Sequence, residues 1–110
     1  MSENVTDEWP IACNMKALDR KQRQRHQLLT AQLHAAVQET SELPDGYSFR
    51  LPSDEGTIQR TAEWITLERL CCPFISFGLE VGRESGPLLL RLTGREGVKP
   101  FLKLELGIKP

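Results

Sequence analysis

The chain lacks the features that would place it in a membrane or on a nucleic acid. Its 110 residues contain no apolar run approaching the roughly 18 residues of a membrane-spanning helix. The formal net charge is −1, so no overall positive field attracts nucleic acid or anionic lipid. The N-terminus is acidic and has no basic segment followed by an apolar run, so we expect no signal peptide and a cytoplasmic location.

Cysteine is scarce and odd in number, since the chain has only Cys13, Cys71 and Cys72. An odd count without a signal peptide predicts a reducing compartment and argues against a disulfide framework. A C-x-x-C pair is also lacking, which excludes a zinc finger. No nucleophile elbow or Cys-His signature is present either, so the sequence points to a non-catalytic domain.

The spacing of apolar residues predicts one α+β domain over residues 1–110, with a loose N-terminal arm (1–12) and a body (13–110). The expected order is α-β-α-β-β-α, with Asp19 and Gln22 forming a capping box at the first helix. The helices are expected over residues 19–38, 53–72 and 98–106, and the strands over 47–51, 74–81 and 87–93. The first two strands would be parallel with the third between them, giving a three-stranded, half-ferredoxin-like sheet with helices packed on it.

The stretch from Trp64 to Phe77 reads as the end of an amphipathic helix, a break, and the start of a strand. Pro73 disfavours the helical conformation at the preceding residue, so the helix should end by Cys72, beginning at an N-cap on Ser53. The helix face expected to pack into the core consists of Ile58, Ala62, Ile65 and Cys72. Trp64 and Cys71 would flank this face, with Glu68 one turn before the cysteines.

Several interpretations of the adjacent cysteines compete. Buried cysteine often acts as a small apolar side chain, so packing alone accounts for the pair. A disulfide between neighbours would be strained, because their Cα atoms lie about 3.8 Å apart and not the usual ~4.4–6.8 Å. A catalytic or redox thiolate is the weaker interpretation, because a helix C-terminus and Glu68 both raise a thiol pKa.

A bound cation, in contrast, is favoured at a helix C-terminus and displaces the thiol protons. We therefore predict that Cys71 and Cys72 bind a thiophilic metal ion such as Cu(I), Zn(II) or Hg(II), although neighbouring residues make poor corners of a tetrahedral site. Cys13 would be a third ligand if the N-terminal arm folds back. Glu68 and His26 are further candidates, although a histidine on an apolar stripe is more often a core residue.

The alternative from a different class is a protein-interaction or homodimerisation module whose cysteines are only packed. Two surfaces would suit it. The open sheet face would carry Arg50, Glu80 and Arg91. The first helix begins with a basic cluster that would suit an acidic protein partner or a phosphate, or would serve solubility alone. The cluster consists of Arg20, Lys21, Arg23 and Arg25.

Glu68 to Glu80 reads E-R-L-C-C-P-F-I-S-F-G-L-E. This segment resembles small uncharacterised bacterial proteins that carry an E-R-x-C-C-P-F-x-x-F-x-L-E motif. The resemblance extends to residues 11–14, 25–26, 43–47, 86–94 and 97–99, and so covers most of the chain. It implies a shared bacterial cytosolic domain and brings no activity with it. The adjacent cysteines are also similar to the pair at the tail of mercuric reductases, over two residues only.

Overall fold

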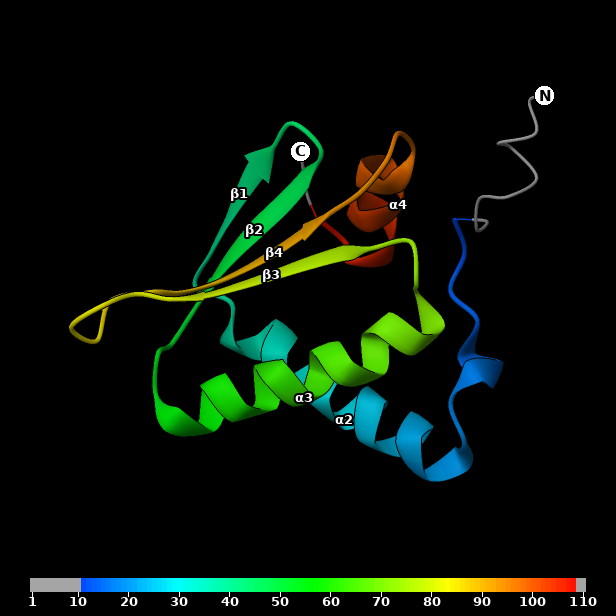
Figure 1. The fold of residues 1–110 in the computed structure, drawn as a ribbon, viewed down its shortest axis with the longest axis horizontal. Coiled ribbons are helices and arrows are strands. Elements are labelled where there is room, and N and C mark those ends of the chain that lie inside the picture. Colours follow the sequence, from blue (N-terminus) through cyan, green and yellow to red (C-terminus); the bar gives the residue numbers. More distant parts are fainter. Residues whose placement is uncertain (1–10, 109–110) are drawn as a thin grey trace.

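A four-stranded antiparallel sheet packs against three α-helices in the computed structural model, which describes residues 11–108 (Figure 1). Most of the expected N-terminal arm lies outside the described residues. No helix among residues 11–108 is long and apolar enough to cross a membrane. The elements are the 3-10 helix η1 (Met15–Ala17), α2 (Arg20–Ala36), β1 (Glu39–Leu43), β2 (Gly46–Leu51), α3 (Glu55–Cys71), β3 (Ser76–Val81), β4 (Leu88–Thr93) and α4 (Val98–Glu105).

The strand order is β1-β2-β4-β3, with every neighbouring pair antiparallel. β4 therefore lies between β2 and β3, which run parallel to each other as the sequence predicted. The prediction of three strands was wrong, because Glu39–Leu43 pairs with β2 as a fourth strand. This edge strand reads E-T-S-E-L and is exposed except at Leu43, so it lacks the apolar alternation that marks a strand in a sequence.

The first helix follows its predicted start closely. The Asp19 side chain accepts from the Gln22 backbone at 2.8 Å, and the Gln22 side chain accepts from the Asp19 backbone at 2.9 Å, which completes the capping box. α2 ends at Ala36, two residues before the expected end. Its buried residues Leu29 and Leu33 belong to the hydrophobic core, and α2 lies beside α3 on one side of the sheet (Figure 1).

The second helix begins one residue later than expected. Asp54, not Ser53, is the N-cap, because its carboxylate accepts from both the backbone and the hydroxyl of Thr57 at 3.1 and 2.7 Å. The helix ends at Cys71 with Cys72 as its C-cap, as the following Pro73 requires.

The face of α3 that packs into the fold also differs from the prediction. Its buried residues, the closed face, are Thr57, Thr61, Trp64, Leu67, Glu68 and Cys71. Ile58 and Ile65 are only partly buried and Ala62 is exposed; we call these three residues the open face. The prediction was wrong because it followed apolar residues alone, whereas hydrogen bonds allow polar side chains to occupy the buried side.

The core lies between the sheet and the helices. β2 and β4 supply its inner layer, to which alternate residues contribute buried apolar side chains: Tyr47, Phe49, Leu51, Leu88, Leu90 and Leu92. Val98 and Leu102 add α4 to this core, and α4 packs against β2. β3 begins at Ser76 and not at Phe74, because residues 73–75 are needed to reverse the chain after α3.

Candidate thiol and carboxylate site

Two segments that are distant in the sequence meet at the C-terminal end of α3. The backbone N–H of Asn14 donates to the carbonyl of Cys71 at 2.7 Å. The Asn14 side chain then accepts from the backbone of Lys16 at 3.1 Å and caps η1. This carbonyl is one of those that a helix end leaves without an intrahelical partner, so the contact stabilises both segments and places Cys13 beside the cysteine pair.

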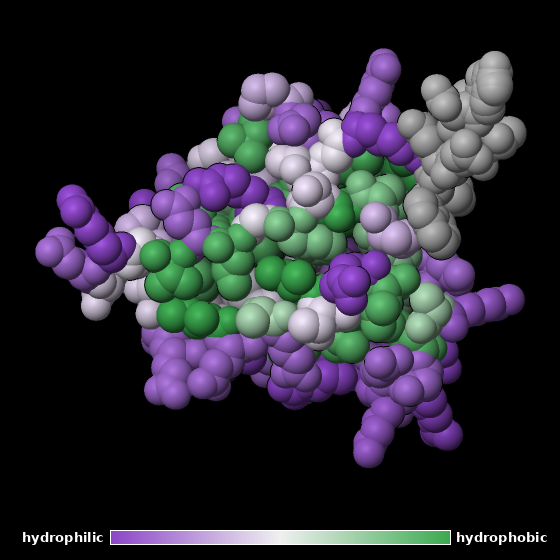
Figure 2. Space-filling model, viewed as in Figure 1, coloured by the Kyte–Doolittle hydropathy of each residue, from purple (hydrophilic) through white to green (hydrophobic). Residues whose placement is uncertain are grey.

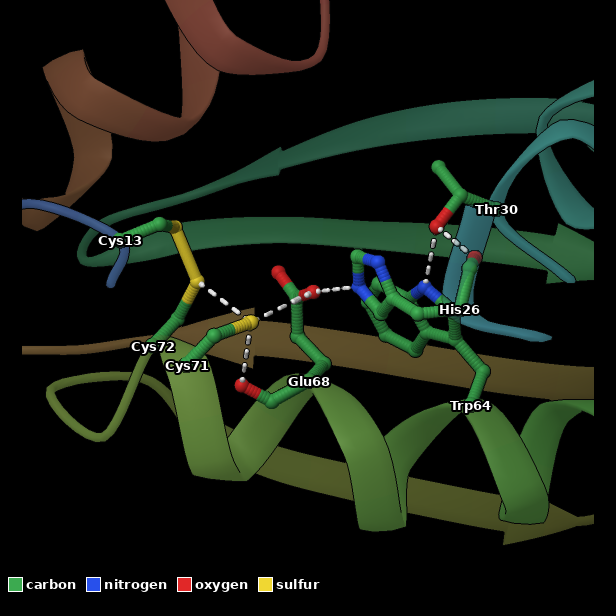
Figure 3. Close-up of a disulfide and its surroundings, with 7 residues drawn as sticks. All are labelled: Cys13, His26, Thr30, Trp64, Glu68, Cys71 and Cys72. Carbon is green, nitrogen blue, oxygen red and sulfur yellow. Dashed lines mark hydrogen bonds and ion pairs between the residues drawn. A yellow bond between two sulfur atoms is a disulfide. The ribbon is translucent and has the colours of Figure 1, made fainter. Parts of the chain in front are cut away.

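Cys13 and Cys72 form a disulfide, with Cα atoms 4.7 Å apart (Figure 3). The cysteine count argued against a disulfide framework, whereas the structure contains this one disulfide. Three cysteines allow one disulfide and one free thiol, and a cysteine count carries no information on which residues meet in space. The adjacent pair is not bonded, since the Sγ atoms of Cys71 and Cys72 are 3.7 Å apart.

Cys71 is the free thiol, and its side chain is fully buried. The thiol lies 3.5 Å from the backbone carbonyl of Glu68 and 3.9 Å from that residue's Oε1 atom. Burial, and then the negative charge of Glu68, raise the pKa of Cys71 from 9.0 to about 11. The sequence predicted that Cys71 would lie at the edge of the apolar face of this helix, whereas it belongs to the closed face of α3 and is fully buried.

Glu68 is the charged residue at the centre of the site. Its Oε1 atom lies 2.6 Å from Nε2 of His26, and both side chains are nearly buried. His26 stacks on Trp64 with ring centroids 6.5 Å apart. Trp64 in turn donates from Nε1 to the hydroxyl of Thr30 at 3.0 Å, and that hydroxyl donates to the His26 backbone carbonyl at 2.7 Å. The imidazole is therefore held by two contacts, the Glu68 carboxylate and the Trp64 ring, and Thr30 fixes the position of that ring relative to the His26 backbone.

These contacts bring together every metal ligand that the sequence suggested. Two overlapping groups have donor atoms within 4.8 Å of one another: Cys13, Glu68 and Cys72 in one, and His26, Glu68 and Cys71 in the other. Glu68 belongs to both. The candidate donors are the two sulfurs of the disulfide, the free thiol of Cys71, one carboxylate and one imidazole. Once the disulfide is reduced, this set of donors suits a soft or borderline metal ion.

Sequence reasoning missed Asn14, Thr30 and Trp64, which orient the ligands without being candidate ligands themselves. Trp64, Glu68 and Cys71 are spaced by four and three residues, so they share one helix face, and that spacing was the available signal. Trp64 also lines a cavity of about 600 Å³ between α2, the β1–β2 hairpin and residues 103–108. Its indole therefore lies between that cavity and the imidazole of His26.

The basic cluster on α2 is partly occupied within the fold. Arg25 forms a two-pronged ion pair with Glu63 of α3, with both N–O distances at 2.8 Å. Arg23 donates to the carbonyl of Leu18 at 2.7 Å. Two of the four basic residues are therefore already engaged in contacts within the fold. Binding of an acidic partner by the cluster remains a prediction.

Comparisons with protein-family models, curated proteins and solved structures give no match to this chain.

Proposed function

We propose that the reduced protein binds one thiophilic metal ion through Cys13, Cys71 and Cys72. The observation that carries the proposal is the position of the Cys72 sulfur, which is bonded to Cys13 and lies 3.7 Å from the sulfur of Cys71, although Cys13 and Cys72 are 59 residues apart in the sequence. Cysteines used only for packing have no need to meet. Soft thiolate ligands select soft and borderline ions, so Cu(I), Zn(II) and Hg(II) are the ions to test.

The spacing of the sulfurs supports this function. Two thiolates on one tetrahedral zinc ion lie about 3.8 Å apart, given zinc–sulfur bonds of about 2.3 Å. The Sγ atoms of Cys71 and Cys72 are 3.7 Å apart. This distance supports the proposal that the two adjacent cysteines would occupy two corners of one site.

The electrostatics also favour a bound cation. The last carbonyls of α3 and the Glu68 carboxylate create a negative environment that disfavours a free thiolate. A metal ion reverses this effect, because it displaces the thiol proton and brings positive charge to the same place. His26 contacts Glu68 directly, so it would orient this carboxylate as a ligand or as a partner of the ligands.

Binding would depend on redox state, because the Cys13–Cys72 disulfide removes two of the three thiolates. An external dithiol supplies two electrons and two protons, which break the sulfur–sulfur bond and leave two thiols. The dithiol itself becomes a disulfide. Oxidised protein would therefore bind the ion weakly and reduced protein tightly.

Native mass spectrometry of the reduced, full-length protein tests the function. The protein is titrated with Zn(II), Cu(I) or Hg(II) in the presence of a competing thiol. We expect one ion per chain, lost in the Cys71→Ser/Cys72→Ser variant and after oxidation, and retained in His34→Ala, whose exposed imidazole lies outside the site. Equal binding by the double-serine variant, or no binding by wild type, would contradict the proposal.

A second candidate is a thiol–disulfide exchange protein, because Cys71 lies 3.7 Å from one sulfur of a disulfide. The Cys71 thiolate would attack Sγ of Cys72, a Cys71–Cys72 bond would form, and Cys13 would leave as a thiolate that takes up a proton. Alkylation of the oxidised protein after an acid quench distinguishes the isomers. Exchange predicts some labelling of Cys13, abolished by Cys71→Ser, whereas labelling confined to Cys71 would exclude it.

A further inference from the structure

Strand β3 forms one edge of the sheet and pairs only with β4 among residues 11–108. The Gly82 N–H donates to the Pro87 carbonyl at 2.9 Å at the end of this ladder. Because hydrogen-bonding direction alternates along an antiparallel strand, residues 76, 78 and 80 point their backbone groups toward β4. Those of Phe77, Leu79 and Val81 therefore point away from the sheet, where residues 11–108 offer them no strand.

The side chains of these same three residues are apolar and incompletely covered. Phe77 and Leu79 are partly buried, and Val81 is 53% exposed. The open face of α3 lies on the side away from α2. Its residues are rotated about 100° from the closed face, and Glu63, which pairs with Arg25 of α2, is rotated about as far in the opposite direction. Figure 2 shows apolar surface gathered in a band over this side of the molecule, between β3 and α3.

This edge has little of the usual protection against pairing. Exposed edge strands commonly carry lysine, proline or a bulge. β3 reads S-F-G-L-E-V, keeps a regular register with β4, and has one charged residue, Glu80. Glu80 points to the other side of the sheet, where Arg91 pairs with it at 2.6 Å. An apolar, regular and unprotected edge is typical of a strand that is covered in the assembled protein.

We propose that a second copy of this chain covers the edge, with the two β3 strands antiparallel about a two-fold axis at Leu79. In this register Phe77 lies opposite Val81 of the second copy, and Leu79 lies opposite its own equivalent. All three apolar side chains then stay on one side of a continuous sheet. Glu80 lies opposite Gly78, which avoids the like-charge contact that a shift to an axis at residue 80 would create.

The open face of α3 is matched to the same axis. The positions Glu55, Ile58, Ala62, Ile65 and Arg69 are spaced by three and four residues and read from either end as charged, apolar, small, apolar, charged. In an antiparallel pair of α3 helices, Ile58 would meet the second copy's Ile65, and Ala62 at the axis would allow close approach.

The charges at the two ends of this series are complementary. Glu55 would lie opposite Arg69 of the second copy, and the two-fold axis would repeat this contact. Both side chains are exposed, and neither forms an ion pair within the described part of the chain. This complementarity is what selects a second copy as the partner, because an unrelated apolar peptide would have no need of it.

Sedimentation velocity of the full-length protein, from low to high micromolar concentration, tests the dimer. Wild type should be dimeric, and Leu79→Lys should be monomeric because it places two ammonium groups at the axis. Leu104→Lys is the matched control, since Leu104 is 85% exposed on α4 and should leave the dimer intact. A non-reducing gel must show no covalent dimer. A wild type that stays monomeric throughout, or a Leu79→Lys dimer, would overturn the proposal.

A charge exchange at exposed residues keeps the test informative if Leu79→Lys fails to fold. Arg69→Glu should weaken the dimer by about tenfold, because it places two like-charge contacts in the interface. Glu55→Arg should do the same. The double variant Glu55→Arg/Arg69→Glu should restore wild-type affinity. If the double variant is weaker than either single variant, the antiparallel arrangement of α3 is wrong.

Discussion

The two faces of α3 reverse the usual arrangement of polar and apolar residues. The closed face buries Thr57, Thr61, Glu68 and Cys71, whereas the open face leaves Ile58 and Ile65 partly exposed. Each buried polar group has a partner: the Thr61 hydroxyl donates to the Thr57 carbonyl at 2.7 Å, and Glu68 pairs with His26 at 2.6 Å. Burial of polar groups is tolerated where they are hydrogen-bonded.

This difference teaches that each face departs from the ordinary pattern for its own reason. On the closed face, Glu68 and Cys71 lie beside the Cys13–Cys72 disulfide, whereas Thr57 and Thr61 are hydrogen-bonded to Asp54 and to the helix backbone. The open face keeps apolar residues at the surface, which is typical of a contact made after folding. The following variants test this contrast, beginning with the largest effect.

Loss of the disulfide should weaken the fold most. Cys13 and Cys72 are separated by 59 residues, and closing a loop of this length stabilises a protein by about 4 kcal/mol. Cys13→Ser should therefore lower the free energy of unfolding in urea by about that amount relative to oxidised wild type. Adding a reductant should bring wild type to the same value and leave the variant unchanged. A wild type indifferent to reductant would show that the disulfide does not form in solution.

Removal of His26 should have the next largest effect. His26→Ala leaves the nearly buried Glu68 carboxylate without its partner, and breaking a buried pair costs about 3 kcal/mol or more. Arg25→Ala is the control, because the Arg25–Glu63 pair links the same two helices at the exposed surface, where loss of an ion pair costs far less. Urea unfolding measures both. Equal losses of unfolding free energy in the two variants would mean that the His26–Glu68 pair is as exposed to solvent as the Arg25–Glu63 pair.

The reactivity of Cys71 is a third test. Its pKa is raised from 9.0 to about 11, so at neutral pH the thiolate is about 100-fold scarcer than in an ordinary cysteine. Iodoacetamide should label the oxidised protein slowly, about tenfold faster for each pH unit up to about 11. A rate that levels off near pH 9 would contradict the burial of the thiol beside Glu68.

The same shift affects stability with a defined sign. The unfolded chain releases the Cys71 proton near pH 9.0 and the folded chain near pH 11, so the folded state binds more protons between these values. The contribution of this group to stability is complete below pH 9 and is lost as the pH rises toward 11. Cys71→Ala should remove this dependence.

Changes on the open face should have the smallest effect on the folded chain. Ile65→Gln should cost the dilute monomer about 1 kcal/mol, because the side chain is only partly buried. Leu67→Gln, two residues further along and 8% exposed, should cost about 3 kcal/mol. Urea unfolding at low protein concentration compares them. A larger loss of unfolding free energy for Ile65→Gln than for Leu67→Gln would show that the open face is part of the core.

Local signals predicted the parts of the fold that local forces control. The Asp19 cap, the helix end before Pro73 and the arrangement of β2, β3 and β4 were all correct. β1 was missed, because a polar edge strand forms only when β2 is there to pair with it. The face of α3 was misjudged, because apolar periodicity takes no account of polar side chains whose hydrogen bonds allow burial. Thr57 and Thr61 bond within the helix and its cap, and Glu68 bonds to His26 of α2.

Residue types in the sequence predicted which side chains would lie close together, but not how they are bonded. Cys13, His26, Glu68, Cys71 and Cys72 were named as one candidate set, and the structure brings them within reach of one another. Their bonding was not foreseen. It depends on the Asn14–Cys71 backbone hydrogen bond, which holds the N-terminal segment against the end of α3. The spacing of residues along the sequence does not predict such a contact between distant segments.

The link between Cys13 and Cys72 also gives the chain a topology of its own. It closes a covalent ring that contains α2, β1, β2 and α3, and from which β3, β4 and α4 extend as a tail. The sheet joins two strands of the ring to two strands of the tail. A single proteolytic cut in the ring, for instance at the exposed Asp54, would open it without releasing a fragment. The two pieces would stay covalently linked until a reductant broke the disulfide. A cut in the tail, in contrast, would leave two polypeptides with no covalent link between them.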